Sequence, residues 1–205
     1  RDRSVSRGLG DVYKRQLSFG EAYDIFAEQA RAAHEAGCDL IFLETFADLL
    51  EAKAALLACV ENTSLPVFAT MTFGEDGRSF MGTTPAIAAT TLSALGASAV
   101  GINCSLGPKE IFPMAKRLAE ALPGDFPVFV KPNAGLPRAD GSGYDITPQL
   151  YAMQMKPYRE LGLFAAGGCC GTTPEYIALL VRALEGKEIR QVPRHVPAAV
   201  CSGTR

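Results

Sequence analysis

The sequence predicts an α/β fold in which parallel strands alternate with helices, as in a (β/α)8 TIM barrel. Three observations support this prediction: apolar runs alternate with helical patterns, the apolar runs lack a polar face, and three of the helices begin with Thr-Pro. Runs that are apolar throughout are typical of parallel strands covered on both sides. The strand starts recur about every 31 residues, the usual length of one unit in a barrel of roughly 250 residues.

The first expected element is an amphipathic helix. It begins at a capping box formed by Ser18 and Glu21, carries apolar residues at helical spacing, and ends at Gly37. Strands and helices then alternate along the rest of the chain. The expected strands cover residues 40–44, 66–73, 98–103, 127–132 and 163–168, and the expected helices cover 48–60, 85–95, 109–122, 148–161 and 174–184.

Three of these helices have well-defined starts. A threonine hydroxyl can cap the first turn of a helix, and proline suits the first helical position because the N–H that it lacks would have no partner there. This arrangement predicts where three of the strand-to-helix loops end, at the pairs Thr84-Pro85, Thr147-Pro148 and Thr173-Pro174.

The number of units bears on the architecture. Five strand-helix units can be recognised, whereas a complete barrel has eight. We therefore expect the C-terminal five units of a barrel, with the first three strands missing. The alternative is an open doubly wound sheet of five parallel strands, which would be complete as it stands.

The two ends of the chain differ from its middle. Residues 1–16 are basic and poor in large apolar residues, and they include DVYKRQ, a string that a common transposon adapter would encode. We expect a non-native or disordered segment there. Residues 17–187 are expected to form the barrel domain. Residues 188–205 contain prolines and lack periodicity, which predicts a linker toward a missing domain.

Composition excludes several classes of protein. The 20 basic and 22 acidic residues leave a formal charge of −2, which predicts no nucleic-acid partner. No apolar run is long enough for a membrane helix and no signal peptide is visible, so we expect a cytoplasmic protein without a membrane partner. The chain has six cysteines, which in that setting indicate metal binding or catalysis before disulfides.

Three of the cysteines stand at the ends of two expected strands. Cys169 and Cys170 lie in the string GGCCGTTP between a strand and a helix, and Cys104 ends the strand SAVGINC two units earlier. The carboxyl ends of barrel strands share one rim, so the three sulfurs can converge there. Three protein ligands with one open position are the pattern of catalytic zinc. The alternative is that these cysteines are simply buried in close-packed loops.

Three strings carry a resemblance to a known family: GINCSLGP at 101–108, KPNAGLP at 131–137 and GGCCGTTPEYI at 167–177. In this order and spacing they resemble the homocysteine methyltransferase family, and within it the homocysteine-binding barrels of cobalamin-dependent methionine synthases. The resemblance covers about residues 18–187. It implies a barrel that binds homocysteine, with methylcobalamin on a separate module and with folate-binding and cobalamin-binding domains of the same chain as further partners.

The resemblance also implies roles for particular residues. Cys104, Cys169 and Cys170 would bind Zn²⁺, and the homocysteine thiolate would take the fourth position. Glu44, in the string FLETF, would hold the ammonium group of the substrate. We also expect Asn103, the residue directly before Cys104, to contribute to substrate binding.

Other interpretations of the polar strand ends remain open. Glu44 could instead favour the start of the next helix, and asparagines after strands, such as Asn103 and Asn133, most often form turns. Lys131 is expected to be a solvated strand end rather than a Schiff-base lysine.

The expected activity is zinc-dependent transfer of a methyl group to homocysteine, which gives methionine. Three cysteine thiolates leave a bound substrate sulfur electron-rich, so it remains a nucleophile. Close alternatives take the methyl group from betaine or S-methylmethionine. A phosphate-binding lyase or isomerase would use the helix after GGCCG, yet no lysine or arginine lies between Arg159 and Arg182 to help it. The last alternative is an inactive, truncated fragment.

Overall fold

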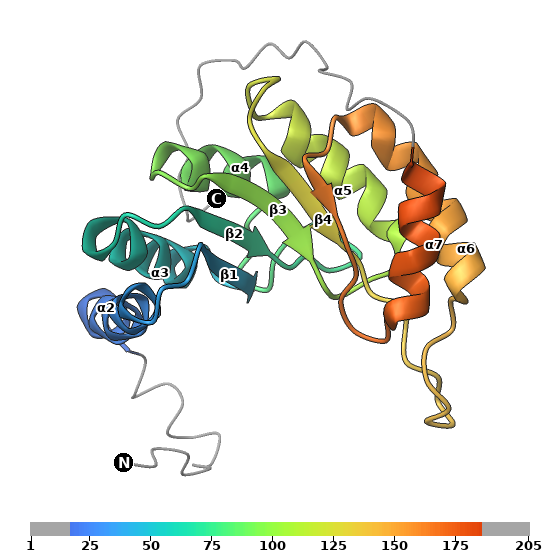
Figure 1. Ribbon diagram of the computed structural model, residues 1–205, viewed down its shortest axis with the longest axis horizontal. Coiled ribbons are helices and arrows are strands. Elements are labelled where there is room, and N and C mark those ends of the chain that lie inside the picture. The colour runs from blue at the N-terminus through green and yellow to red at the C-terminus, as the bar shows by residue number, and fades with distance from the viewer. Residues whose placement is uncertain (1–16, 186–205) are drawn as a thin grey trace.

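A single parallel sheet of five strands organises the molecule (Figure 1). The computed structural model describes residues 17–185. The strands follow one another across the sheet in chain order, as in a barrel, whereas a doubly wound sheet reverses its order at a switch point. The doubly wound alternative is therefore wrong. The strands are β1 (Ile41–Phe46), β2 (Val67–Met71), β3 (Ala99–Asn103), β4 (Val128–Lys131) and β5 (Ala165–Ala166).

Helices precede β1 and follow each of the five strands. The capping box of Ser18 and Glu21 is present, and the hydroxyls of Thr84 and Thr147 accept hydrogen bonds from their helices as expected. Thr173 occupies the capping position without such a bond. Instead, the hydroxyl of Thr172 closes this loop by donating to the carbonyl of Cys169 at 2.7 Å. The helices are α2 (Phe19–Glu35), α3 (Leu49–Asn62), α4 (Pro85–Ala94), α5 (Pro108–Glu120), α6 (Pro148–Met155) and α7 (Pro174–Leu184).

The helix expected over residues 148–161 is divided. The α-helix α6 ends at Met155, and a 3₁₀ helix, η1 (Lys156–Leu161), follows it. Pro157 lies in the first turn of η1, where its missing N–H cannot continue the α-helical hydrogen bonds. The strand expected over 163–168 is also shorter, because only Ala165 and Ala166 have the strand conformation.

The main core lies between the sheet and the helices. Side chains that point outward from the strands, such as Val67, Val100 and Val128, are fully buried against helix residues such as Leu56 and Leu118. The strands approach each other closely at Gly101, where an added Cβ would collide with the carbonyl oxygen of Phe129.

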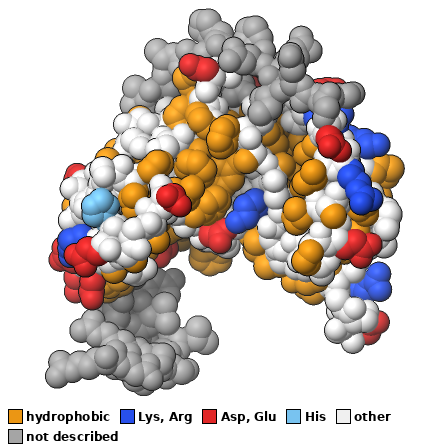
Figure 2. Space-filling model, viewed as in Figure 1, with side chains coloured by type: hydrophobic (Ala, Val, Ile, Leu, Met, Phe, Trp, Pro, Cys, Tyr) orange, Lys and Arg blue, Asp and Glu red, His pale blue; other side chains and the backbone are white. Residues whose placement is uncertain are grey.

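Phenylalanine rings cover part of the opposite face of the sheet. Phe42, Phe68, Phe129 and Phe164 form a chain of ring contacts with centroids 4.9 to 6.3 Å apart. Phe42 and Phe164 are 36% and 54% exposed. Figure 2 shows hydrophobic side chains gathered over the sheet on the face turned toward the viewer. We call this side of the sheet the inner face, since in a barrel it would line the interior.

Two further expectations from the sequence concern the ends of the chain and membrane-spanning helices. The segments expected at 1–16 and 188–205 lie outside the described residues, so their expected character stays a prediction. Among the helices that the structure describes, none combines the length and the apolar character needed to cross a bilayer.

Candidate metal centre

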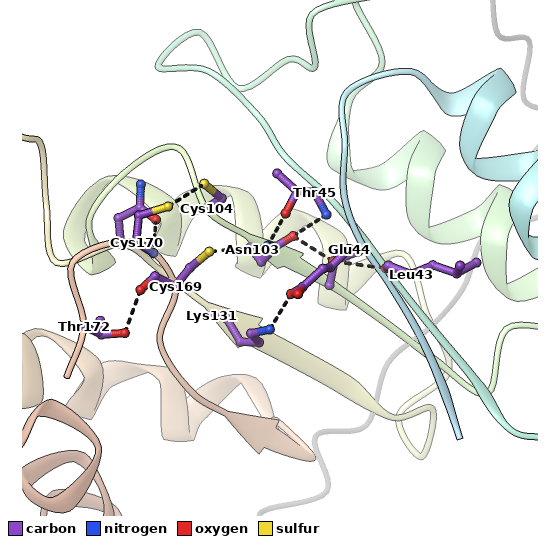
Figure 3. Close-up of polar contacts among 11 residues, drawn as sticks. Leu43, Glu44, Thr45, Asn103, Cys104, Lys131, Cys169, Cys170 and Thr172 are labelled. Atoms are coloured by element: carbon purple, nitrogen blue, oxygen red, sulfur yellow. Dashed lines mark hydrogen bonds and ion pairs between the residues drawn. The ribbon is translucent and has the colours of Figure 1, made fainter. Parts of the chain in front are cut away.

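The three cysteines predicted from the sequence lie together at the carboxyl edge of the sheet (Figure 3). Their sulfur atoms are all within 4.8 Å of one another, and the sulfurs of Cys104 and Cys170 are 3.6 Å apart. Tetrahedral zinc with Zn–S bonds of about 2.3 Å places its sulfur ligands about 3.8 Å apart. The arrangement of Cys104, Cys169 and Cys170 therefore fits a zinc ion with one remaining position.

The last residue of β4 and the residue after it hold both cysteine loops in place. The N–H of Cys104 donates to the carbonyl of Lys131 at 3.0 Å, and the N–H of Cys169 donates to that of Pro132 at 2.8 Å. Cys104 itself adopts a left-handed conformation, with φ of 64°, which few residues other than glycine adopt. The carbonyl of Cys104 also accepts from the N–H of Leu106 at 2.9 Å, so backbone hydrogen bonds at both its N–H and its carbonyl fix this turn.

Asn133 has a more specific role than the turn formation expected from the sequence. The residue is 6% exposed, and its side-chain oxygen accepts a hydrogen bond from the N–H of Cys170 at 3.0 Å. The carbonyl of Cys170 in turn accepts from the N–H of Ala134 at 2.9 Å. Asn133 therefore fixes the backbone of one predicted metal ligand.

The three thiols influence one another electrostatically. A hydrogen bond with Cys104, followed by burial and by the charges of Cys104 and Cys169, raises the pKa of Cys170 to about 11. The same cluster contributes to the raised pKa of Tyr144, for which burial is the largest cause. Neighbouring thiolates repel one another, and a divalent cation between them removes that repulsion. The mutual repulsion of the three thiolates therefore favours the binding of a cation between them.

Asn103 connects this cluster to β1. Its side-chain oxygen accepts hydrogen bonds from the N–H of Thr45 at 2.8 Å and from the hydroxyl of Thr70 at 2.7 Å. Its amide nitrogen donates to the hydroxyl of Thr45 at 2.7 Å and to the sulfur of Cys169 at 3.6 Å. These four contacts fill the hydrogen-bonding capacity of the fully buried amide. The geometry shows Asn103 as a positioning group, and its expected contact with substrate stays a prediction.

β1 is irregular where it carries Glu44. The strand continues to Phe46 rather than ending at residue 44, and its register against β2 shifts between Leu43 and Phe46. Thr45 has φ of 69°, an outlier for a β-branched residue, and the bonds from Asn103 hold it there. The bulge leaves the Glu44 carboxylate on the inner face, on the side where the three cysteines lie (Figure 3).

Lys131 is not the solvated strand end that the sequence suggested. Its ammonium group lies 2.5 Å from the carboxylate of Glu44 and 4.5 Å from the centroid of the Phe42 ring. The lysine and glutamate side chains are 25% and 45% exposed. The sequence did not reveal this pair, because the two residues are 87 positions apart and meet only through the shape of the sheet.

The remaining cysteines stand outside the cluster. Cys59 is buried in α3, and burial raises the pKa of its thiol to about 11, so it stays protonated near neutral pH. Cys38 is exposed, and Cys201 lies outside the described residues.

Comparisons with known proteins identify the family and the fold. The model of the family described as homocysteine S-methyltransferase matches residues 3–184. Two crystal structures of the homocysteine methyltransferase MmuM from Escherichia coli have the same fold at 22% sequence identity. The apo form has a TM-score of 0.63 with 83% of this chain and 59% of that chain covered, and the metallated form has 0.62 with 84% and 55%. The chain thus spans little more than half the length of these structures. With the match extending over most of its length, this chain belongs to the homocysteine S-methyltransferase family.

Proposed function

We propose that the protein is part of a zinc-dependent enzyme that transfers a methyl group to the thiolate of homocysteine and so forms methionine. The observation that carries the proposal is the set of three cysteine sulfurs within 4.8 Å of one another at the carboxyl edge of the sheet. A set of three thiolates suits zinc and leaves one position for a substrate sulfur. Family membership supports methyl transfer over the phosphate-binding lyase or isomerase.

The residues of this chain divide the work of binding and orientation. Bound zinc would keep the substrate sulfur as a thiolate at neutral pH. Asn103 and Asn133 hold Cys169 and Cys170 in place. Glu44 offers its carboxylate to the substrate ammonium, which would fix the amino-acid end. In the transfer itself, the substrate sulfur forms a bond to the methyl carbon while the donor leaves with the electron pair of the broken bond.

The methyl donor and the further partners are also part of the proposal. The resemblance to methionine synthases supports methylcobalamin on a separate module, with folate-binding and cobalamin-binding domains in the same protein. Betaine and S-methylmethionine remain alternative donors on the same barrel. The five described cysteines are all unpaired, which suits a reducing compartment such as the cytoplasm.

Zinc binding tests the proposal directly. The full chain should bind one zinc ion, and the double variant Cys169→Ala, Cys170→Ala should lose it, because too few thiolates would remain. Metal analysis after dialysis gives the stoichiometry, and homocysteine titrated into the zinc-loaded protein should bind and release protons in calorimetry.

The matched control is Cys38→Ala, which removes an exposed cysteine outside the cluster and should leave zinc and homocysteine binding unchanged. Full zinc content in the double variant would contradict the metal site. Zinc binding without any thiol binding would contradict the substrate while leaving the metal site intact. Neither measurement requires the chain to be active alone, so the inactive fragment is a separate outcome of a methyl-transfer assay.

A further inference from the structure

The ion pair between Lys131 and Glu44 lies where the proposed substrate would place its amino-acid end. The pair connects β4 to β1 across the two strands between them, on the inner face and below the cysteine cluster (Figure 3). Asn103 contacts Cys169 on one side and Thr45, the neighbour of Glu44, on the other. The metal centre and the ion pair are therefore adjacent parts of one site.

The surroundings of Lys131 direct its side chain along this face. A Cβ added at Gly167 would lie 3.3 Å from the Cγ atom of Lys131, so the glycine leaves room for the lysine stem. The ring of Phe42 lies beneath the ammonium group. Phe42 and Gly167 thus hold the charged end near Glu44 while both charged groups remain accessible to a ligand.

The chemistry of an amino acid calls for two charged partners at this place. The α-carbon of homocysteine carries an ammonium and a carboxylate, and Glu44 can bind only the first. An open ion pair offers one group of each sign, and inserting a zwitterion between them leaves the net charge of the site unchanged. We propose that Lys131 binds the α-carboxylate of the substrate while Glu44 binds its ammonium group, an inference that rests on the proposed function.

This assignment makes Lys131 a specificity-determining residue. A thiol that has an ammonium but no carboxylate must break the ion pair and leaves Lys131 without a partner, so it should bind less tightly than homocysteine. A charge-assisted hydrogen bond in a partly shielded site corresponds to about tenfold to a hundredfold in affinity. The pair would then select α-amino-acid thiols over simpler aminothiols.

The test compares three thiols by calorimetry on the zinc-loaded full chain. The probes are homocysteine, aminopropanethiol, which lacks the carboxylate, and mercaptobutyrate, which lacks the amino group. Lys131→Met should weaken homocysteine and mercaptobutyrate about tenfold to a hundredfold. Aminopropanethiol should bind Lys131→Met at least as tightly as before, because Glu44 has lost its competing ion. Glu44→Gln should show the converse pattern, weakening homocysteine and aminopropanethiol but not mercaptobutyrate.

Two further variants keep the result interpretable. Lys131→Arg retains a carboxylate partner and should keep homocysteine affinity within about tenfold of the unaltered protein. Lys116→Met removes another ion-paired lysine, 3.9 Å from Glu120 on the surface of α5, and should change none of the affinities. Zinc content verifies that each variant retains the metal site.

Several outcomes would overturn the assignment. Homocysteine binding to Lys131→Met as tightly as to the unaltered protein, or equal losses for homocysteine and aminopropanethiol, would show that the carboxylate binds elsewhere. If Lys131→Met loses zinc, the test is the comparison of homocysteine and aminopropanethiol on the unaltered zinc-loaded protein. Equal affinities for the two thiols would then refute the proposal. Absence of thiol binding to the unaltered zinc-loaded protein would instead refute the proposed function, and the assignment with it.

Discussion

Among single residues, Asn103 has the most connections in the site. Its buried amide fixes the left-handed Thr45 on β1 and contacts the sulfur of Cys169 after β5. The bulge that presents Glu44 and the loop that presents Cys169, a proposed metal ligand, therefore depend on the same side chain. We expect changes at residue 103 to disturb both ends of the proposed substrate site.

Asn103→Ala should lower the free energy of unfolding by about 2 to 3 kcal/mol, because the N–H of Thr45 and the buried hydroxyl of Thr70 lose the Asn103 oxygen as an acceptor. Thr70→Val is the matched variant, since it removes only one of these bonds and keeps the shape of the side chain. It should cost about 1 kcal/mol. Chemical denaturation of the two variants measures both values, and equal losses would contradict the central role of Asn103.

At this scale, the sequence predicted which cysteines come together and missed the residues that support them. Sulfur at the ends of two apolar runs is a local pattern, so Cys104, Cys169 and Cys170 could be identified from the order of residues alone. The contact of Lys131 with Glu44 could not, because it depends on how four strands are arranged. The bond from the N–H of Cys170 to Asn133 depends likewise on the approach of two distant loops.

At the scale of elements, the strand and helix pattern was predictable and several boundaries were not. Alternating apolar runs and Thr-Pro starts located the five strands and their helices. The division of the expected helix 148–161 follows from Pro157, yet its exact place depends on packing of η1 against α5 and α7. The bulge at Thr45 has no local signal, because a threonine there is typical of an ordinary strand.

The contact between β3 and β4 is the least tolerant of a larger side chain. Gly101→Ala should destabilise the protein by about 3 kcal/mol, because its Cβ would collide with the carbonyl oxygen of Phe129 and separate the strands. The same substitution at Gly20 in α2, where a Cβ would meet nothing within 4 Å, should stabilise by about 0.5 to 1 kcal/mol. Thermal unfolding compares the pair, and similar melting temperatures would contradict this view of the sheet.

At the scale of the whole molecule, the inner face is the exposed apolar surface that matters. Phe42, Phe68 and Phe164 lie on it in contact with one another, and β1 and β5 are the edges of the described sheet. Exposed apolar faces and unpaired strand edges promote association between copies of a chain. The chain of 205 residues should therefore self-associate when it is expressed alone.

Phe164→Ser should reduce this association, because Phe164 is 54% exposed on the inner face. Met153→Ser is the control, since Met153 is 57% exposed on α6, on the helical side of the molecule. Sedimentation velocity at several protein concentrations measures the association. A monomeric protein that unfolds cooperatively, or equal effects of the two variants, would show that the inner face is covered.

The chain-order arrangement of the strands also has a kinetic consequence. Each strand pairs with the strand next to it in the sequence, so the sheet can grow one unit at a time with little loop-closure entropy at each step. The contact between Cys104 and Cys170 spans 66 residues, and that between Lys131 and Glu44 spans 87. The ion pair closes only after β1 to β4 have assembled, whereas the cysteine cluster requires only β3 to β5. During refolding, the cysteine cluster can therefore form from the C-terminal units before Lys131 and Glu44, the groups proposed to bind the amino-acid end of the substrate, come together.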